Sequence, residues 1–358
     1  MKKINHLHGG RLYSDVLGEG LKYIEDRMNG RIKSFKVPWL GLNRAGVGGL
    51  EWGSMLTIGA RPGSGKTLVV SQILRESRAL NSTQDFNILE FQFEMGGKQS
   101  AARAFAAETA LDYNIVLSTD KQLDKFSHEM MEKYREDTRI FEEVGIYRVM
   151  INESLTHKEI RDTIIHYYNE LGGKPLVVSI DHSWLIKKSS DEKEKIATLY
   201  NTTEMIMQLK NQLPICVIMI TQLNRSIEEP NRKVQGVIAN YPTSSDIFGG
   251  DALMQGSDMV VALSRPFTVN IPFYGPKGYI VSPDDVFMHL LKIRNGSDNV
   301  NMLFMKAEFK RQRMIEVGEP QASNQGSGRA GGGYVRLSQR ITNAGGPSSP
   351  DDIDIDDI

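Results

Sequence analysis

Short apolar runs alternate along most of the chain with longer amphipathic stretches. The apolar runs predict buried strands at residues 55–58, 87–93, 147–151, 176–180, 215–221 and 258–263. Apolar positions at three- and four-residue spacing predict helices at residues 98–111, 119–144, 156–171 and 193–212. Buried strands separated by amphipathic helices predict an α/β fold, with a doubly wound and mostly parallel sheet covered on both faces.

Three further apolar runs, at residues 286–293, 300–309 and 314–317, have no helical stretch between them. Consecutive strands joined by short connections pair antiparallel, so we expect these three strands at one edge of the same sheet.

The chain divides into three regions. Residues 1–38 contain a predicted helix at 14–31, with Ser14 as its N-cap, and then a basic connector. This helix either covers its own domain or docks on a neighbouring molecule, and the sequence leaves both open. Residues 39–318 form the α/β domain. Residues 319–358 are rich in Gly, Ser, Asn and Pro, and we predict that they are disordered.

The charge is uneven along the chain. Five Asp residues lie in the last eight positions, and without them 43 basic side chains face 39 acidic ones. The mildly basic body is compatible with nucleic-acid binding. The acidic tail is either a solvated end or a peptide that docks on a basic, apolar groove of a partner or competes with nucleic acid.

Composition also limits the compartment. No apolar run reaches the roughly 20 residues that span a bilayer, and the N-terminus has no signal-peptide core. The single cysteine, Cys216, lies within an apolar run, which suits strand packing and a reducing environment. We therefore predict no membrane association and a cytoplasmic location.

A glycine-rich segment joins the first predicted strand to the start of a helix. Its residues are Ala60, Arg61, Pro62, Gly63, Ser64, Gly65, Lys66 and Thr67. The backbone N–H groups of such a turn, together with the helix N-terminus, can surround a polyphosphate. Lys66 then reaches the β- and γ-phosphates, and the Thr67 hydroxyl binds Mg²⁺. Ala60 replaces the usual first glycine, and its methyl group still fits a tight turn. The segment predicts a nucleoside triphosphatase.

Three other strand ends carry side chains that complete such a site. Asp181 follows a buried strand and is the predicted second Mg²⁺ ligand, while Glu94 ends another strand and is the predicted base for the attacking water. Gln222 ends a third strand, where an amide can sense the γ-phosphate. Because parallel strands end at one edge of a sheet, we expect these groups to meet at the glycine-rich turn.

The ordered segments ARPGSGKT, FQFEM, VVSIDHSWLI, TQLNR and KIRNG resemble those of the DnaB-like hexameric replicative helicases. The likeness covers about residues 14–310. It implies a RecA-like P-loop core, ATP or another nucleoside triphosphate with Mg²⁺, and a homo-oligomeric ring, expected to be a hexamer, that moves on single-stranded DNA in the 5′-to-3′ direction. It also implies that Glu94 is the base, that Gln222 couples hydrolysis to DNA, and that the helix at 14–31 docks on the adjacent subunit. Lys292 and Arg294, two residues apart on one strand face, would enter the neighbour's nucleotide site.

The chain departs from this family in its DNA-binding loop. Phe248 and Gly249 stand where many relatives have an Arg-Glu pair. We therefore expect sequence-tolerant phosphate contacts from the backbone around Gly249 and Gly250, or from Arg225, Arg232 and Lys233. The alternative is that the basic stretch is a solvated loop.

The resemblance also bears on partners. Full-length bacterial relatives carry an N-terminal primase-binding domain, and only about 13 residues precede the first predicted helix here. The chain thus resembles a compact phage-type helicase, acting in a host cytoplasm if phage-encoded. Contacts with primase, a helicase loader or a single-strand-binding protein would use other surfaces.

Two other functions fit a RecA-like core. A recombinase or repair ATPase would form open filaments, and the predicted linker helix argues against it. A regulatory nucleotide-binding adaptor would produce little motor output, and Glu94 argues against it, because a switch that does not hydrolyse needs no base.

Overall fold

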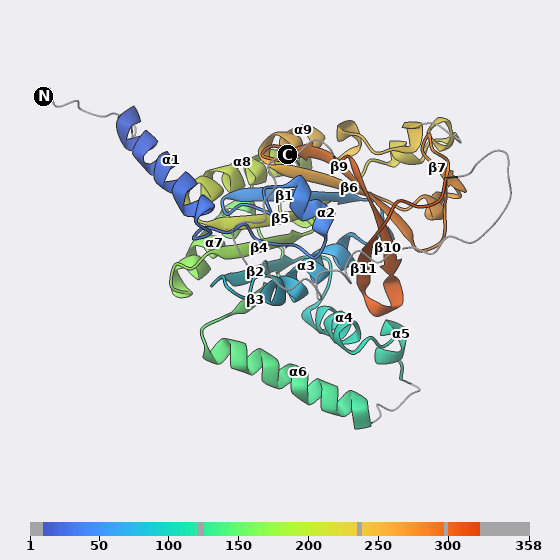
Figure 1. Cartoon of the computed structure of the whole chain (residues 1–358), viewed down its shortest axis with the longest axis horizontal. Coiled ribbons are helices and arrows are strands. Elements are labelled where there is room, and N and C mark those ends of the chain that lie inside the picture. The colour runs from blue at the N-terminus through green and yellow to red at the C-terminus, as the bar shows by residue number, and fades with distance from the viewer. Residues whose placement is uncertain (1–9, 120–124, 235–237, 297–299, 323–358) are drawn as a thin grey trace, which may run out of the picture.

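The computed structural model describes residues 10–119, 125–234, 238–296 and 300–322. Within these ranges a nine-stranded sheet forms the centre of the molecule (Figure 1). Its strands lie in the order β11 (Arg313–Val317), β10 (Met302–Glu308), β9 (Asp285–Ile293), β6 (Met259–Ser264), β1 (Ser54–Ala60), β5 (Ile215–Gln222), β4 (Leu176–Asp181), β2 (Asn87–Gln92) and β3 (Arg148–Ile151).

Six neighbouring strands, from β6 to β3, are parallel, and β9, β10 and β11 pair antiparallel at the other edge. Both features confirm the fold predicted from the sequence. The strand boundaries differ from the predicted ones by one or two residues.

Alternation along the central strands divides the core into two layers. In β5, Cys216, Ile218 and Ile220 pack with α3 (Lys66–Leu80), whereas Val217 and Met219 pack on the other face. That second face is covered by α7 (His157–Glu170), α8 (Lys195–Gln212) and α9 (Gly250–Gly256). Burial raises the pKa of the Cys216 thiol to about 12, which fits the predicted packing role.

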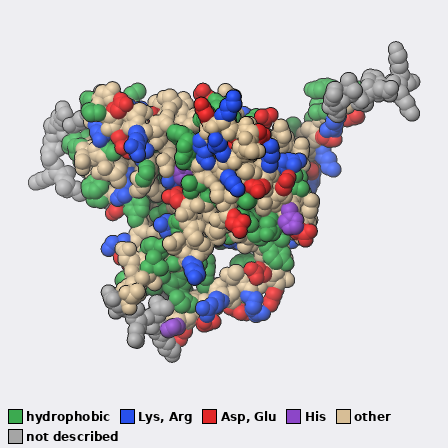
Figure 2. Space-filling model, turned by 180° about the vertical axis from the view of Figure 1, so that it is seen from behind, with side chains coloured by type: hydrophobic (Ala, Val, Ile, Leu, Met, Phe, Trp, Pro, Cys, Tyr) green, Lys and Arg blue, Asp and Glu red, His purple; other side chains and the backbone are tan. Residues whose placement is uncertain are grey.

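The remaining helices lie outside this sandwich. The helix α1 (Tyr13–Met28) projects from the body, and α6 (Lys125–Glu143) lies apart from the sheet beyond β3 (Figure 1). Between the sheet and α6 lie α4 (Gly97–Thr109) and the short α5 (Tyr113–Val116). Basic and acidic side chains are interspersed over the reverse face (Figure 2). None of the helices in the described ranges is long and apolar enough to cross a membrane.

Local predictions failed where no periodic pattern marks the element. Ser14 does not cap α1: the helix begins at Tyr13, and its N-cap Leu12 makes no side-chain hydrogen bond. The predicted helix at 119–144 begins as α6 at Lys125, and residues 120–124 lie outside the described ranges. Short elements were missed; they are α2 (Leu40–Ala45), α5, α9, β7 (Phe273–Tyr274) and β8 (Tyr279–Ile280).

Contacts with the domain continue past residue 318, where the sequence predicted the disordered tail to begin. Glu319 accepts hydrogen bonds from Lys277 (2.7 Å) and Tyr279 (2.6 Å), and Ala322 forms a backbone bridge with Tyr279. The predicted disordered tail otherwise lies outside the described residues.

A buried ion pair joins three elements at the N-terminal edge of the sheet. Asp258, just before β6, pairs with Lys210 of α8, whose side chain is almost fully buried, and accepts a hydrogen bond from the Met55 backbone N–H of β1 (2.9 Å). Removing the carboxylate would leave the ammonium buried without a counter-charge.

We therefore expect Asp258→Ala to lower the free energy of unfolding by about 3 kcal/mol in chemical denaturation, because the buried ammonium of Lys210 loses its partner. The exposed pair of Lys158 and Asp191 provides the control, because water screens it: Asp191→Ala should leave the unfolding midpoint unchanged. Equal effects of the two substitutions would contradict the role of Asp258.

Candidate active site

The parallel register brings the predicted groups to one edge of the sheet. Ala60, the last residue of β1, pairs with Gln222 of β5, and Gln92 of β2 pairs with Asp181 of β4. The glycine-rich turn begins directly after Ala60. The strand ends that the sequence predicted to meet are therefore adjacent.

The turn has the backbone shape of a phosphate cradle. Gly63 and Gly65 have φ angles of 79° and 90°, which side chains rarely tolerate, and a side chain on Gly65 would also meet Met314 at 3.0 Å. Gly65 is the N-cap of α3, so the first N–H groups of that helix have no partner within it. The Ser64 N–H donates to the Arg61 carbonyl (3.2 Å), which closes the turn after Pro62. The free N–H groups and the helix dipole make this turn an anion site.

Asp181 is strongly perturbed by its surroundings. It is fully buried, and in the described part of the chain neither carboxylate oxygen has a hydrogen-bond partner. Burial, and then the nearby Glu94, raise the pKa of Asp181 to about 6, while Lys66 and Thr67 oppose this rise. A buried carboxylate without a partner, beside a threonine hydroxyl and a lysine, is a suitable site for a divalent cation.

The donor set fits Mg²⁺ held jointly by protein and substrate. Among the described residues no three His, Cys, Asp or Glu side chains form a metal cluster. Mg²⁺ is typically bound by one or two protein oxygens together with phosphates and water. Thr67 and Asp181 would supply those protein oxygens.

Glu94 lies on the open side of the same site. Its side chain is 47% exposed, and its Oε2 is 3.9 Å from Nζ of the nearly buried Lys66. A carboxylate that reaches solvent beside the cradle can accept a proton from water.

Gln222 connects this site to the next loop. The Leu223 N–H donates to the Ala60 carbonyl (3.2 Å), and the Gln222 carbonyl accepts from the Phe248 N–H (2.9 Å). These two hydrogen bonds therefore couple the position of Phe248 to that of Ala60 through Gln222 and Leu223.

Arg61 does not point into the cradle. Its guanidinium pairs with Glu228 and donates to the Leu223 carbonyl (3.1 Å). The Arg61 side chain therefore ties the turn to the segment after β5, and only its backbone faces the predicted nucleotide site.

The residues expected to bind DNA fall into two groups. Arg225 and Lys233 are exposed, and Gly249 has a φ angle of 71° just before Gly250 starts α9. Arg232, in contrast, binds both oxygens of Asp246 (2.6 and 2.9 Å) and the carbonyls of Ala239 and Tyr241. Each of the three nitrogens of the Arg232 guanidinium is thus engaged within the chain, which holds the loop in place.

Lys292 and Arg294 lie on the same side of β9, as alternation predicts. Both side chains donate to the Gln255 carbonyl at the end of α9, and Arg294 also pairs with Asp258 (3.0 Å). Ile293 pairs with Met259, whose β1 neighbour is Leu56, four residues before the end of the strand at Ala60. Four strand residues span about 13 Å, so Arg294 lies at the opposite end of the sheet from its own glycine-rich turn.

Sequence analysis missed two cations near the site. The Arg265 guanidinium donates to the Gly63 carbonyl (3.0 Å) and stacks 4.2 Å from the Phe309 ring centroid. Arg103, on α4, is close enough to Asp181 to oppose the rise in its pKa. Neither belongs to a short motif, so only the folded chain reveals them.

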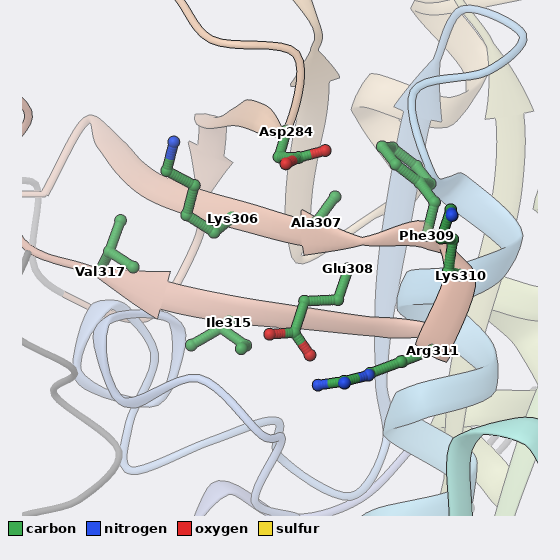
Figure 3. Close-up of a pocket in the computed structure, with 9 residues that line it drawn as sticks. All are labelled: Asp284, Lys306, Ala307, Glu308, Phe309, Lys310, Arg311, Ile315 and Val317. Carbon is green, nitrogen blue, oxygen red and sulfur yellow. The ribbon is translucent and has the colours of Figure 1, made fainter. Parts of the chain in front are cut away.

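A hollow of about 760 Å³ lies at the β10–β11 hairpin and is distinct from the catalytic groups. Asp284, Lys306 and Phe309 are among the residues that line it (Figure 3), whereas Lys66, Glu94 and Asp181 do not. Phe309 is its link to the glycine-rich turn.

The raised pKa of Asp181 predicts a stability cost. The folded chain holds this proton more tightly than the unfolded chain does, so between pH 3.8 and about 6 stability falls as the pH rises. In metal-free buffer at pH 7.5, Asp181→Asn should therefore raise the free energy of unfolding by up to about 3 kcal/mol. The gain should shrink as the pH falls toward 4 in denaturation curves, and a gain that does not depend on pH would contradict this explanation.

Comparisons with known proteins agree with this geometry. Residues 41–313 match the family model of the DnaB-like helicase C terminal domain. The chain is 24% identical over 353 residues to the replicative DNA helicase DnaB of Helicobacter pylori, covering 94% of this chain and 64% of the relative. It therefore spans less than two thirds of that relative's length.

Solved structures show the same fold. A structure of a DnaB-like replicative helicase and its interactions with primase has a TM-score of 0.66 at 17% identity, covering 83% of this chain and 67% of that chain. The structure of an ATPase domain has a TM-score of 0.66 at 16% identity, covering 83% of this chain and 97% of that chain. With its RecA-like core and its matched family model, the chain belongs to the DnaB-like helicase C-terminal domain family.

Proposed function

We propose that the chain hydrolyses ATP or another nucleoside triphosphate. The observation that carries this proposal is the buried, unpartnered Asp181 carboxylate beside the glycine-rich turn. Lys66 would neutralise charge on the β- and γ-phosphates, and Glu94 would accept the proton of the attacking water. Mg²⁺, when bound by Thr67 and Asp181, would neutralise developing phosphate charge. Gln222 would sense the γ-phosphate and pass its state to the loop that contains Phe248.

Hydrolysis on this proposal requires a second copy of the chain. Arg294 lies at the far end of the sheet from its own turn. On this proposal it would serve the nucleotide site of a neighbour. Its side chain is 45% exposed despite its pairing with Asp258, which leaves it accessible to a partner. Lys292 would reinforce the same contact.

The helix α1 supports assembly independently. None of its residues is buried, and it exposes an apolar set to solvent; the set is Tyr13, Val16, Leu17, Leu21, Ile24 and Met28. Its C-terminal end is held to the body by Arg27, which donates to Ser34 (3.1 Å) and to the Val47 carbonyl (3.2 Å). A helix anchored at one end and apolar along its length suits docking on an adjacent subunit. Membership of the family supports a closed homo-oligomer, and a hexamer is the expected form.

The assembled form would act as a replicative helicase on single-stranded DNA. Arg225 and Lys233 are exposed on the segment that follows Gln222, where phosphate contacts would be coupled to hydrolysis. Primase, a helicase loader or a single-strand-binding protein are the expected partners, and the cytoplasm, of a host if the chain is phage-encoded, is the expected location.

Two assays test this function. Single-stranded DNA should stimulate hydrolysis, and forked duplexes with a 5′ or a 3′ overhang should be unwound with one polarity, expected to be 5′-to-3′. Hydrolysis without stimulation by DNA would favour the adaptor, while open filaments in electron micrographs would favour the recombinase.

Mixing of variant subunits tests the contact between subunits. Arg294→Ala should retain nucleotide binding and lose about 10³–10⁵-fold in hydrolysis, because the transition-state charge is no longer neutralised. Lys66→Ala should also be inactive. Mixing the two should restore part of the turnover, because some interfaces then join an intact turn to an intact Arg294.

The control is Lys310→Ala, which removes an exposed cation on another edge of the sheet that pairs with Asp112 (3.3 Å). It should hydrolyse normally, because both Lys66 and Arg294 are intact in it. Full activity of a strictly monomeric protein would refute the contact between subunits.

A further inference from the structure

An exposed tryptophan lies beside the candidate active site and belongs to none of the groups assigned above. Trp184 is in the 3₁₀ turn η1 (Ser183–Leu185), three residues after Asp181. Its side chain is 40% exposed, whereas Trp39 is 1% exposed. An exposed tryptophan in a defined orientation is a candidate contact surface.

Side chains from two other segments hold Trp184 in place. The Phe248 ring packs against it in a T-shaped arrangement, with ring centroids 4.5 Å apart and an interplanar angle of 84°. The Lys195 ammonium lies 5.8 Å from the centroid of the Trp184 ring, and it also donates to the Ile186 carbonyl. Three segments that are distant in sequence thus converge on one indole, and we call Trp184, Phe248 and Lys195 the aromatic platform.

Two lysines lie close to the platform. Burial lowers the pKa of Lys195, and the negative charge of Glu192 opposes this effect. The positive charge of Lys188 is close enough to lower the pKa of Lys195 further. Glu192 is already engaged by the Ser189 N–H (2.8 Å), Thr198 (2.8 Å) and Asn201 (2.7 Å). An aromatic face next to two ammonium groups is complementary to a base and its phosphate.

The platform is also joined to the catalytic strand ends. The Phe248 N–H donates to the Gln222 carbonyl (2.9 Å), and Trp184 follows the strand that ends at Asp181. A ligand on the platform would therefore contact both loops that leave the nucleotide site.

We propose that the aromatic platform is a stacking subsite for an unpaired base of single-stranded DNA. This inference rests on the proposed function and adds to it, because it places an aromatic contact where phosphate contacts alone were expected. Trp184 stacks on the base, Phe248 braces Trp184 from the side, and Lys188 and Lys195 face the adjoining phosphates. Stacking does not distinguish among bases, so the subsite suits a protein that moves along any sequence.

The test compares oligo(dT) with a strand of the same length in which abasic sites replace the bases. Affinities are measured by fluorescence anisotropy of labelled strands with the full chain and a non-hydrolysable nucleotide. Trp184→Ala should weaken binding of oligo(dT) by about 10-fold, within the range for loss of one stacked base, and should barely change binding of the abasic strand. Trp184→Phe should recover part of the loss.

Tyr147→Ala provides the matched control. Tyr147 is also an exposed aromatic residue, but it precedes the parallel strand β3, whereas Trp184 follows β4. The two residues therefore lie at opposite ends of the parallel strands. Its loss should change neither affinity.

A second measurement needs no substitution. Oligo(dT) should quench the tryptophan emission of the unmodified protein, and the abasic strand should not, because Trp184 is far more exposed than Trp39. Equal quenching by both strands, or equal loss of both affinities in Trp184→Ala, would overturn the stacking subsite while leaving the proposed function intact. If the unmodified protein binds neither strand, the proposed function itself fails, and the subsite fails with it.

Discussion

The parallel hydrogen-bond register of β1, β5, β4 and β2 is the constraint on which the other features depend. Pairing of Ala60 with Gln222 and of Asp181 with Gln92 sets four strand ends side by side. A slip of one residue in any pair would turn its side chains to the other face of the sheet. The register is fixed because the strands are buried on both faces, as the alternation of Cys216, Val217, Ile218 and Met219 between the two core layers shows.

The same burial also determines the electrostatics of the site. Asp181 lies in a strand that the core requires to be apolar, and its carboxylate has no hydrogen-bond partner in the described part of the chain. The folded chain therefore carries an unfavourable charge that a cation would relieve. Strain of this kind at a functional position is the usual form of the trade between stability and activity.

The antiparallel edge of the sheet is the reason for proposing that a second subunit completes the site. Because β9 runs against β6, its C-terminal cations reach the start of β6 rather than the glycine-rich turn. There Lys292 and Arg294 contact the carbonyl end of α9, where the helix dipole favours positive charge. This arrangement holds both cations in position before any neighbour is present. The exposed apolar residues of α1 fit the same proposal, in which each subunit contacts the next.

The sequence by itself determined the fold class, and it predicted that the strand ends with Glu94, Asp181 and Gln222 meet beside the glycine-rich turn. Apolar period and strand-end polar residues are local signals, and burial preserves them in the folded chain. Only the tertiary structure decided which groups the cationic side chains contact. It turned Arg61 and Arg232 toward Glu228 and Asp246, and it brought Arg265 and Trp184 to the site from segments without a motif. The physical reason is that a long charged side chain chooses its partner by distance in space, and sequence spacing does not encode that distance beyond a few residues.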